Sequence, residues 1–350
     1  IDEKNNGKPY LAFLERVFQK LLLNFTWWVN RKDYNGKNLF GGGFLGLDNI
    51  GAFDRNMEFS EGEHLEQADG TSWMAMYALN MMRIAMELAT YNPVYEDMAI
   101  KFFEHYLYIA EAMENIGEDK QGLWNEEDGF FYDLLQLSNG DSVNLKLRSI
   151  VGLIPMFAVE VVEHSMLEKL PEFKKRMEWI LKNKQDLTKL VSQWYVEGEG
   201  NKHLLSILRK TRLTKVLTRL VDESEFLSDY GIRAMSKVYE ENPFRFTVHG
   251  QEHVVYYTPA ESDSRMFGGN SNWRGPIWFP INFLIVESLQ RFDFFFGDSL
   301  KIEYPKGSGE YKNLDEVSKD ISNRLCKIFL KDENGNRAFN GGVEKFNQDP

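Results

Sequence analysis

Apolar residues recur along most of the chain at spacings of three and four, a pattern that predicts long amphipathic helices. The ranges with this pattern are 11–30, 73–90, 94–115, 149–163, 171–183, 211–221, 230–239, 275–292 and 314–330. Pro93, Pro171 and Pro276 lie at or near the starts of such ranges. Proline is tolerated there because the first residues of a helix need no intrahelical partner for their N–H groups.

Three long stretches rich in Gly, Asn, Asp and aromatic residues separate the helical ranges, at 34–57, 117–144 and 242–273. Two alternating runs at 244–248 and 253–258 predict a β-hairpin. Connections in a simple helix bundle run to about 2–8 residues, so these loops indicate another all-α architecture. We expect a toroid of paired helices, with long loops and short hairpins forming a pocket at one end. Because no linker-like or low-complexity tract divides the chain, we expect residues 1–350 to form a single domain.

Composition narrows the classes of partner. The formal net charge is −12 and no block of Lys and Arg interrupts it, so we expect no binding to nucleic acid or to anionic membranes. No run approaches the roughly 20 apolar residues of a membrane-spanning helix. The single cysteine, Cys326, cannot form an internal disulfide, which fits a reducing compartment and favours a cytoplasmic location. Because Cys326 follows Leu325 in an apolar helical pattern, we expect it in the core.

The segment GGGFLGLDNIGAFDR (41–55) combines glycines with polar groups. Glycines let a backbone approach a ligand closely, Phe44 lies among them, and Asp48 adds a carboxylate. The segment is no phosphate loop, because no Gly-Lys-Ser/Thr follows and no GxGxxG opens a helix after a strand. Two interpretations remain open: a ligand-binding loop, or a structural turn in which Asp54 and Arg55 form a local ion pair.

The segment HLEQADGTSWMA (64–75) places Asp69 beside a tryptophan at the start of a predicted helix. Asp69 or Ser72 can cap a helix that starts near Trp73, although no Glu or Gln completes a capping box. Alternatively, Asp69 is a catalytic acid. Burial beside Trp73 and repulsion from a second carboxylate such as Glu66 would favour the protonated form that an acid catalyst needs.

The segment NSNWRGPIW (270–278) gathers groups that suit a sugar. Trp273 and Trp278 can stack on the C–H face of a sugar ring, while Asn272 and Arg274 can hydrogen-bond hydroxyl groups. The alternative is that the tryptophans belong to the core and that Arg274 forms an ion pair.

Acidic and aromatic residues are also mixed in WNEEDGFFYD (124–133), which contains Trp124 and Glu127. The Asp-Gly step predicts a turn, so a solvated hairpin competes with a sugar-lining role. His249 and His253 have the spacing of a zinc pair, but Gly250 and the strand-like run after it argue against a helix there. We therefore expect no metal site.

Four segments in this order, GGFLGLDNIGAFDRN, HLEQADGTSWMA, LWNEEDGFFYD and GGNSNWRGPIWFPINFLI, resemble glycoside hydrolase family 63. This is the family of mannosyl-oligosaccharide glucosidase and its bacterial relatives, and the resemblance extends from about Gly41 to Pro350. It implies an (α/α)6 barrel and an inverting hydrolase. The implied substrate is a terminal α-glycosidic bond, usually α-glucosidic, of an oligosaccharide or small glycoside. No cofactor is implied, and the oligomeric state stays open.

The resemblance also implies roles by position. Asp69 matches the general acid, Asp48 matches an acidic residue that lines the sugar pocket, and Trp273, Arg274 and Trp278 match a segment of the pocket wall. The other residues expected to contact substrate are Phe44, Glu66, Trp73, Trp124, Glu127 and Asn272.

One departure from the family pattern affects the expected mechanism. The relatives place the general base in a Gly-rich, Trp-containing segment near the C-terminus, whereas this sequence ends at GVEKFNQDP, with only Glu344 nearby. The last barrel helix is also missing, and the sequence starts at Ile1 without a methionine. We therefore expect a barrel truncated at both ends, with the base outside it. The alternative is a catalytically inactive carbohydrate-binding (α/α)6 barrel. A helical scaffold for protein partners would leave the Trp, Asn and Arg residues without a purpose.

Overall fold

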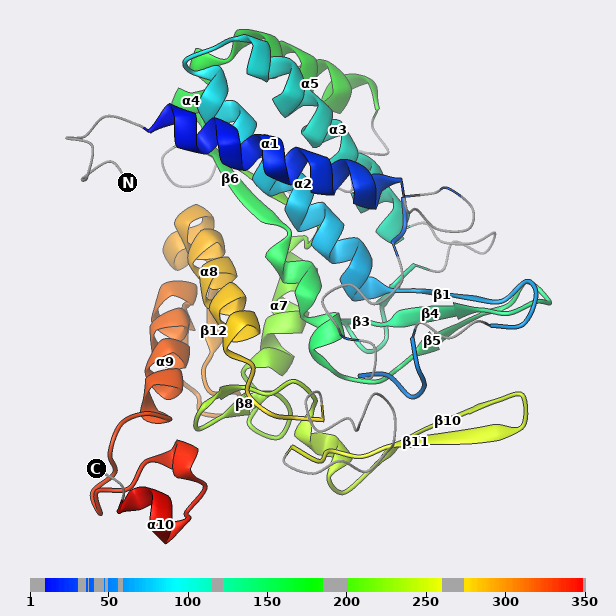
Figure 1. The fold of residues 1–350 in the computed structure, drawn as a ribbon, viewed down its shortest axis with the longest axis vertical. Helices are drawn as coiled ribbons and strands as arrows, with labels where there is room; N and C mark the ends of the chain where they lie inside the picture. The colour runs from blue at the N-terminus through cyan, green and yellow to red at the C-terminus, as the bar shows by residue number, and fades with distance from the viewer. Residues whose placement is uncertain are drawn as a thin grey trace. The chain divides into compact units, whose positions relative to one another are not determined.

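The computed structural model describes residues 10–30, 36, 38–40, 47, 50–55, 59–114, 122–184, 201–259 and 274–348 (Figure 1). Contacts between Cα atoms divide the chain into two compact units. The first contains Ile1–Asp48, Arg55–Lys146 and Val151–Leu213, and the second contains Asn49–Asp54, Leu147–Ile150 and Thr214–Pro350. The division falls inside helix α7 (Lys210–Leu220). The single domain expected from the sequence stays a prediction.

Helix α2 is the centre of the first unit. The helices of this unit are α1 (Leu11–Val29), α2 (Ala68–Ala89), α3 (Val94–Glu114), α4 (His164–Lys169) and α5 (Pro171–Asn183). α2 packs against α1, α3 and strand β6 (Val159–Glu163), and α1 crosses over it (Figure 1). Alanines and methionines cover most of the buried surface of α2, and the small alanines let neighbouring helices approach closely.

Short antiparallel strands complete the first unit. β1 (His64–Glu66), β4 (Asp133–Gln136) and β5 (Ser142–Leu145) form a sheet in the order β1-β4-β5, in which Glu66 lies opposite Leu134. The remaining pairs are β2 (Trp124–Asn125) with β3 (Phe130–Phe131), and β6 with β7 (Lys202–Ser206). The register of β1 on β4 brings the residues just before α2 next to Asp133, the first residue of β4.

The second unit is built around α8 (Phe279–Phe296) and α9 (Leu314–Lys327), which pack against each other. Its strand pairs are β8 (Leu227–Ser228) with β9 (Gly231–Ile232), β10 (Phe244–Val248) with β11 (Gln251–Val255), and β12 (Lys301–Glu303) with β13 (Tyr311–Asn313). The short helix α10 (Glu344–Asn347) is the last element in the described part of the chain. Buried Asn282 of α8 ties β9 to the helix, because its side chain accepts from Ile232 N at 2.7 Å and donates to Ile232 O at 3.0 Å.

Several sequence predictions of elements are confirmed. The helices expected at 11–30, 94–115, 171–183, 211–221 and 314–330 correspond to α1, α3, α5, α7 and α9, and the expected hairpin is β10–β11. Among the described residues, no helix combines the length and apolar composition needed to cross a membrane.

Two predicted helices are wrong. Residues 149–163 form the 3-10 turns η3 (Ile150–Gly152) and η4 (Ile154–Phe157) followed by β6, whose β-branched valines suit its pairing with β7. Residues 230–239 form β9 and the turn η5 (Lys237–Tyr239). Gly231 has φ +122°, which a helix does not allow.

The ends and faces of other helices also differ from expectation. The helix expected at 275–292 begins only at Phe279, because Gly275 has φ +118°. Cys326 is exposed, so its expected place in the core is wrong. The buried face of α9 runs through Val317, Ile321 and Leu325, and Cys326 lies one position beyond that face.

Candidate functional site

Asp69 lies inside the first turn of α2 and does not cap it. The helix begins at Ala68, five residues before the expected Trp73, and its N-cap position is Gln67, whose side chain makes no capping hydrogen bond. The hydroxyl of Ser72 donates to Ala68 O at 2.5 Å instead. The expected capping roles of Asp69 and Ser72 are therefore wrong.

The carboxylate of Asp69 binds the guanidinium of Arg55 through two hydrogen bonds, from Nη1 at 2.9 Å and from Nη2 at 2.5 Å. The same guanidinium binds Asp133 of β4 through Nε at 2.9 Å and Nη2 at 3.1 Å. We name these three residues the Arg55 cluster. All three are buried, with exposed fractions of 4% for Arg55, 1% for Asp69 and 7% for Asp133. One cation thus neutralises at most one of two buried carboxylates.

The electrostatics of the Arg55 cluster favour retention of a proton. Burial raises the pKa of Asp133; Arg55 opposes this rise and the charge of Asp69 reinforces it. Burial alone would lower the pKa of Arg55, but the charges of Asp133 and Asp69 outweigh burial and raise it. Arg55 therefore remains a cation, and the surplus negative charge lies on the two carboxylates. Chemically, the cluster can hold one proton in a place shielded from water.

The first turn of α2 also anchors the glycine-rich segment at several points. Arg55 Nη1 donates to Leu47 O at 3.3 Å, and Phe40 N donates to the hydroxyl of Thr71 at 3.1 Å. A Cβ atom on Gly70 would lie 2.7 Å from Phe40 O, so only glycine permits this approach. The described residues 40, 47 and 55 are thus all tied to α2 or to its ion pair.

The other residues of the first unit that were expected to contact substrate differ in their burial and in their partners. Glu66 is buried and its Oε1 lies 3.1 Å from His64 Nε2. Trp73 is buried against Phe157, with ring centroids 5.5 Å apart, and buried Trp124 lies under the guanidinium of Arg212 at 4.9 Å. Glu127, in contrast, is on the surface, in an ion pair with Lys146 at 3.1 Å. The structure therefore places Glu66, Trp73 and Trp124 with Asp69 in the interior of this unit, and Glu127 at its surface.

Two predicted residues lie in the second unit. Arg274 is buried, and its backbone oxygen accepts from Thr258 N at 2.9 Å. Trp278 is half-buried at the N-cap of α8, where its oxygen accepts from the side chain of Asn282 at 2.9 Å. The remaining predicted residues, Phe44, Asp48, Asn272 and Trp273, lie outside the described residues.

The two histidines lie in a hairpin and not on a helix, as the strand-like run after Gly250 indicated. The Asp-Gly step forms the turn that it predicted. His249 lies at the turn of the β10–β11 hairpin with φ +51°, and His253 is in β11. Gly129, with φ +61°, turns the chain between β2 and β3. Within the described part of the chain, no group of three His, Cys, Asp or Glu side chains is arranged to hold a metal ion.

Sequence reasoning missed Arg55 and Asp133 as partners of Asp69. Arg55 follows Asp54 directly, which suggests a local ion pair, and Asp133 ends a segment in which Trp124 and Glu127 suit a sugar. Asp133 is 78 positions from Arg55 in the chain, so no local spacing relates them. β1 and β4 have no alternating pattern that would have predicted their pairing either.

Comparison with known proteins gives a family match and one curated relative. Residues 2–329 match the family described as "Glycosyl hydrolase family 63 C-terminal domain". "Uncharacterized protein YMR196W" of Saccharomyces cerevisiae is 53% identical over 344 residues, which are 95% of this chain and 31% of that protein. The chain therefore spans about a third of the length of this curated relative.

Likeness to solved structures is weak. A structure titled "Sialidase" has a TM-score of 0.47 at 14% identity, covering 82% of this chain and 18% of that one. The GH63 mannosylglycerate hydrolase from Thermus thermophilus in complex with glucose has a TM-score of 0.30 at 13% identity, covering 66% of this chain and 36% of that one.

Proposed function

Because the chain belongs to glycosyl hydrolase family 63, we propose that it forms the catalytic part of an inverting exo-α-glycosidase. The proposed substrate is a terminal α-glucosidic or related α-glycosidic bond of an oligosaccharide or small glycoside. The match over residues 2–329 is the observation that carries the proposal, since it supports glycoside hydrolysis and a carbohydrate substrate. The helix-rich units are compatible with the proposed (α/α)6 barrel.

Asp69 is the proposed general acid. It would donate a proton to the leaving oxygen as positive charge develops on the sugar ring. Its buried position in the first turn of α2, with Glu66 and Trp73 close in the chain, supports this role.

Inversion also needs a second carboxylate that activates a water on the other face of the sugar, about 6.5–9.5 Å from the acid. Asp133 does not meet this requirement. It contacts the same nitrogen, Arg55 Nη2, as Asp69 does, at 3.1 Å and 2.5 Å respectively. The guanidinium of Arg55 fills the space between the two carboxylates, so a sugar and an attacking water cannot lie between them. We assign Asp133 to the support of Arg55 and not to the base.

The ion pair sets a condition on the proposed role of Asp69. Both of its oxygens accept hydrogen bonds from Arg55, and Oδ1 also accepts from Gly70 N at 2.8 Å. A proton donor must carry hydrogen on one of these oxygens. The proposal therefore requires that substrate binding draws one oxygen of Asp69 away from Arg55.

The same ion pair favours a second candidate function. If Asp69 keeps both hydrogen bonds to Arg55 in the presence of ligand, it is an anchor for the glycine-rich segment. The protein is then a catalytically inactive carbohydrate-binding barrel, unless another residue supplies the proton.

Sugar release by the full-length protein from α-linked gluco- and manno-oligosaccharides, measured beside Asp69→Asn, tests the proposal. Asparagine keeps the size of the side chain but cannot donate the proton. We expect kcat/KM on oligosaccharides to fall by about 10²–10⁴-fold, as for other general acids. NMR of the first-formed product should show the β-anomer, because inversion of an α-glycoside requires it.

Hydrolysis of a glycosyl fluoride distinguishes the two roles considered for Asp69, general acid and structural anchor. Fluoride leaves without protonation, so loss of a general acid should spare hydrolysis of α-glucosyl fluoride by Asp69→Asn. Loss of an anchor should impair both substrates equally. Equal impairment, or an unimpaired variant, would remove Asp69 from the acid role, and inactivity of the parent protein would favour the binding barrel.

A further inference from the structure

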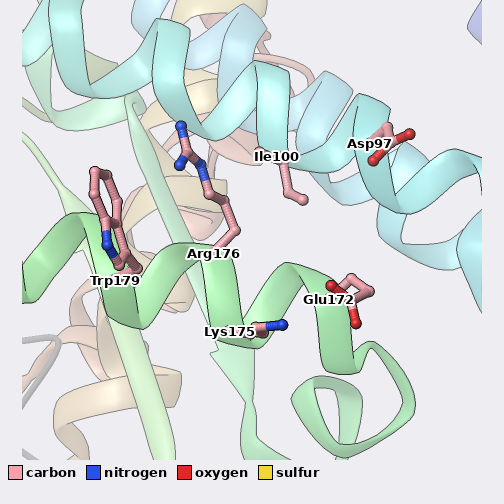
Figure 2. A pocket seen from close by; sticks show the side chains of 6 residues that line it. All are labelled: Asp97, Ile100, Glu172, Lys175, Arg176 and Trp179. Atoms are coloured by element: carbon pink, nitrogen blue, oxygen red, sulfur yellow. The ribbon is translucent and has the colours of Figure 1, made fainter.

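A groove of about 470 Å³ lies between α3 and α5 on the first unit. Its lining residues are Asp97, Ile100, Glu172, Lys175, Arg176 and Trp179. Asp97 and Ile100 project from α3, and the other four come from α5 (Figure 2). The volume is within the range of about 300–1,000 Å³ that small-molecule sites occupy. None of these residues belongs to the Arg55 cluster or to the residues implied by the family resemblance.

The two helices that form the groove are fixed against each other. The buried carboxylate of Glu96 on α3 accepts hydrogen bonds from the backbone N–H groups of Glu172 and Phe173, at 3.0 Å and 2.9 Å. The rings of Phe103 and Phe173 meet edge to face at 6.0 Å. The groove is therefore held in shape without a ligand, and a ligand would not have to order its walls.

An exposed indole forms one end of the groove. Trp179 is 49% exposed, and the guanidinium carbon of Arg176 lies 4.9 Å from its ring centroid. Arg176 is held in turn by Glu104, to which Nε donates at 3.2 Å and Nη2 at 2.8 Å. This chain of contacts orients an aromatic ring that remains half exposed. Figure 2 shows Arg176 and Trp179 on the same helix, α5. A ring held in this way is a platform for an apolar face of a ligand.

Polar groups beside the platform are available for hydrogen bonding. The side chains of Asp97, Glu172 and Lys175 make no hydrogen bond or ion pair with other described residues. They offer two acceptors and one donor. Because the lining combines two acids with two bases, and Glu104 already pairs with Arg176, the groove has no excess positive charge to attract a phosphate or other anion.

We infer that this groove is an accessory binding site for a neutral saccharide, separate from the site of hydrolysis. A sugar ring presents a C–H face to an indole and hydroxyl groups that both donate and accept. It therefore matches the Trp179 platform, the two carboxylates and the ammonium group together. The identity of the sugar rests on the proposed function, since an accessory site would hold the same class of α-linked oligosaccharide that the protein hydrolyses.

Titration calorimetry of the full-length protein with maltoheptaose and with α-mannooligosaccharides tests the inference. Trp179→Ala should weaken binding about tenfold, because it removes the platform. Trp179→Phe should retain part of the affinity. Trp27→Ala is the matched control, since Trp27 on α1 is also 49% exposed but does not line the groove. It should bind as the parent protein does.

Hydrolysis of a small α-glycoside by the same variants separates this inference from the proposed function. Trp179→Ala should leave kcat/KM on the small glycoside unchanged. Saccharide binding that depends on Trp179 in a protein with no hydrolytic activity would support the groove and contradict the proposed function. Equal saccharide binding by the Trp179→Ala and Trp27→Ala variants would contradict a saccharide site in the groove, whatever the hydrolytic activity. Binding of a basic peptide in place of saccharide would contradict it as well.

Discussion

Each of the two units contains a three-membered charge cluster, with one cation and two carboxylates in the first unit and two cations and one carboxylate in the second. In the first unit, Arg55 binds two carboxylates. In the second, Glu225 accepts from Arg148 at 3.2 Å and from Arg219 at 2.6 Å, and we name these three residues the Glu225 cluster. The surplus charge of the trio is therefore negative in the Arg55 cluster and positive in the Glu225 cluster.

The two clusters also differ in where the surplus charge lies. The side chains of Arg148 and Arg219 are 28% and 18% exposed, so water reaches both cations of the Glu225 cluster. Asp69 and Asp133 have side chains only 1% and 9% exposed. An unpaired charge is far less costly beside water than in the interior. The charges of the Glu225 cluster are thus partly solvated, whereas the Arg55 cluster is cut off from water and is sensitive to any change in charge, which suits a functional site.

The largest expected effect comes from removal of the central cation by Arg55→Met. This substitution keeps much of the volume but leaves Asp69 and Asp133 buried without the cation that pairs with them. We expect the free energy of unfolding, measured by urea denaturation, to fall by about 3–5 kcal/mol at neutral pH. The loss should shrink in acid, where the carboxyl groups bind protons.

A triple variant provides the control for this prediction. Adding Asp69→Asn and Asp133→Asn to Arg55→Met removes all three charges, so the triple variant should be more stable than Arg55→Met alone. If the triple variant is less stable, packing around Arg55, and not the unpaired carboxylates, accounts for the loss.

Where local rules were sufficient, the sequence predicted the fold well. The helices α1, α3 and α5 follow from apolar spacing and from Pro93 and Pro171 at their starts. The helix predicted at 149–163 is wrong because part of this range forms β6, which is stabilised by pairing with β7, about forty residues later in the chain. Its buried apolar residues cannot be told apart from those of a buried helix by periodicity alone.

In the candidate site, too, contacts between residues far apart in the sequence were not predicted. The resemblance indicated Asp69, but the burial of Trp124 was not foreseen, because the sequence left only a solvated hairpin or a sugar-lining role open for its segment. The partner of Asp69 was not foreseen, because Arg55 is 14 positions away and reaches it only after β4 and α2 have packed together. Whether Asp69 donates a proton depends on that contact. A side chain can thus be located from the sequence before its chemistry can be specified.

A pH-dependent effect of intermediate size should distinguish the Arg55 cluster further. Because the pKa of Asp133 is raised above its ordinary value of 3.8, the folded protein binds a proton there that the unfolded chain releases. Stability from this group is therefore present at low pH and is lost as the pH rises from 3.8 through the raised pKa. Asp133→Asn should abolish this loss.

Unfolding free energies of the parent and Asp133→Asn across acidic to neutral pH measure this effect. The stability of the parent relative to the variant should decline as the pH rises, with a slope of at most about 1.4 kcal/mol per pH unit. The asparagine also changes the hydrogen bonds to Arg55 and to Ala68 N, but that contribution is constant with pH. A relative stability that increases with pH would show that Arg55 outweighs burial and holds Asp133 ionised.

The smallest effect is expected in the Glu225 cluster. Glu225→Gln removes the carboxylate charge, but Arg148 and Arg219 can turn toward water, and the amide oxygen can still accept from Ser236, now 3.1 Å away. We expect a loss of about 1 kcal/mol in the free energy of unfolding.

Glu252→Gln in the exposed pair with Arg245 on the β10–β11 hairpin is the matched control and should change stability by less than about 0.5 kcal/mol. The three substitutions Arg55→Met, Glu225→Gln and Glu252→Gln then rank by how completely the remaining charges are cut off from water. If Glu225→Gln instead destabilises the protein as much as Arg55→Met, access to water does not separate the two clusters. The sensitivity of the Arg55 cluster would then be an ordinary property of any buried ion pair and no guide to function.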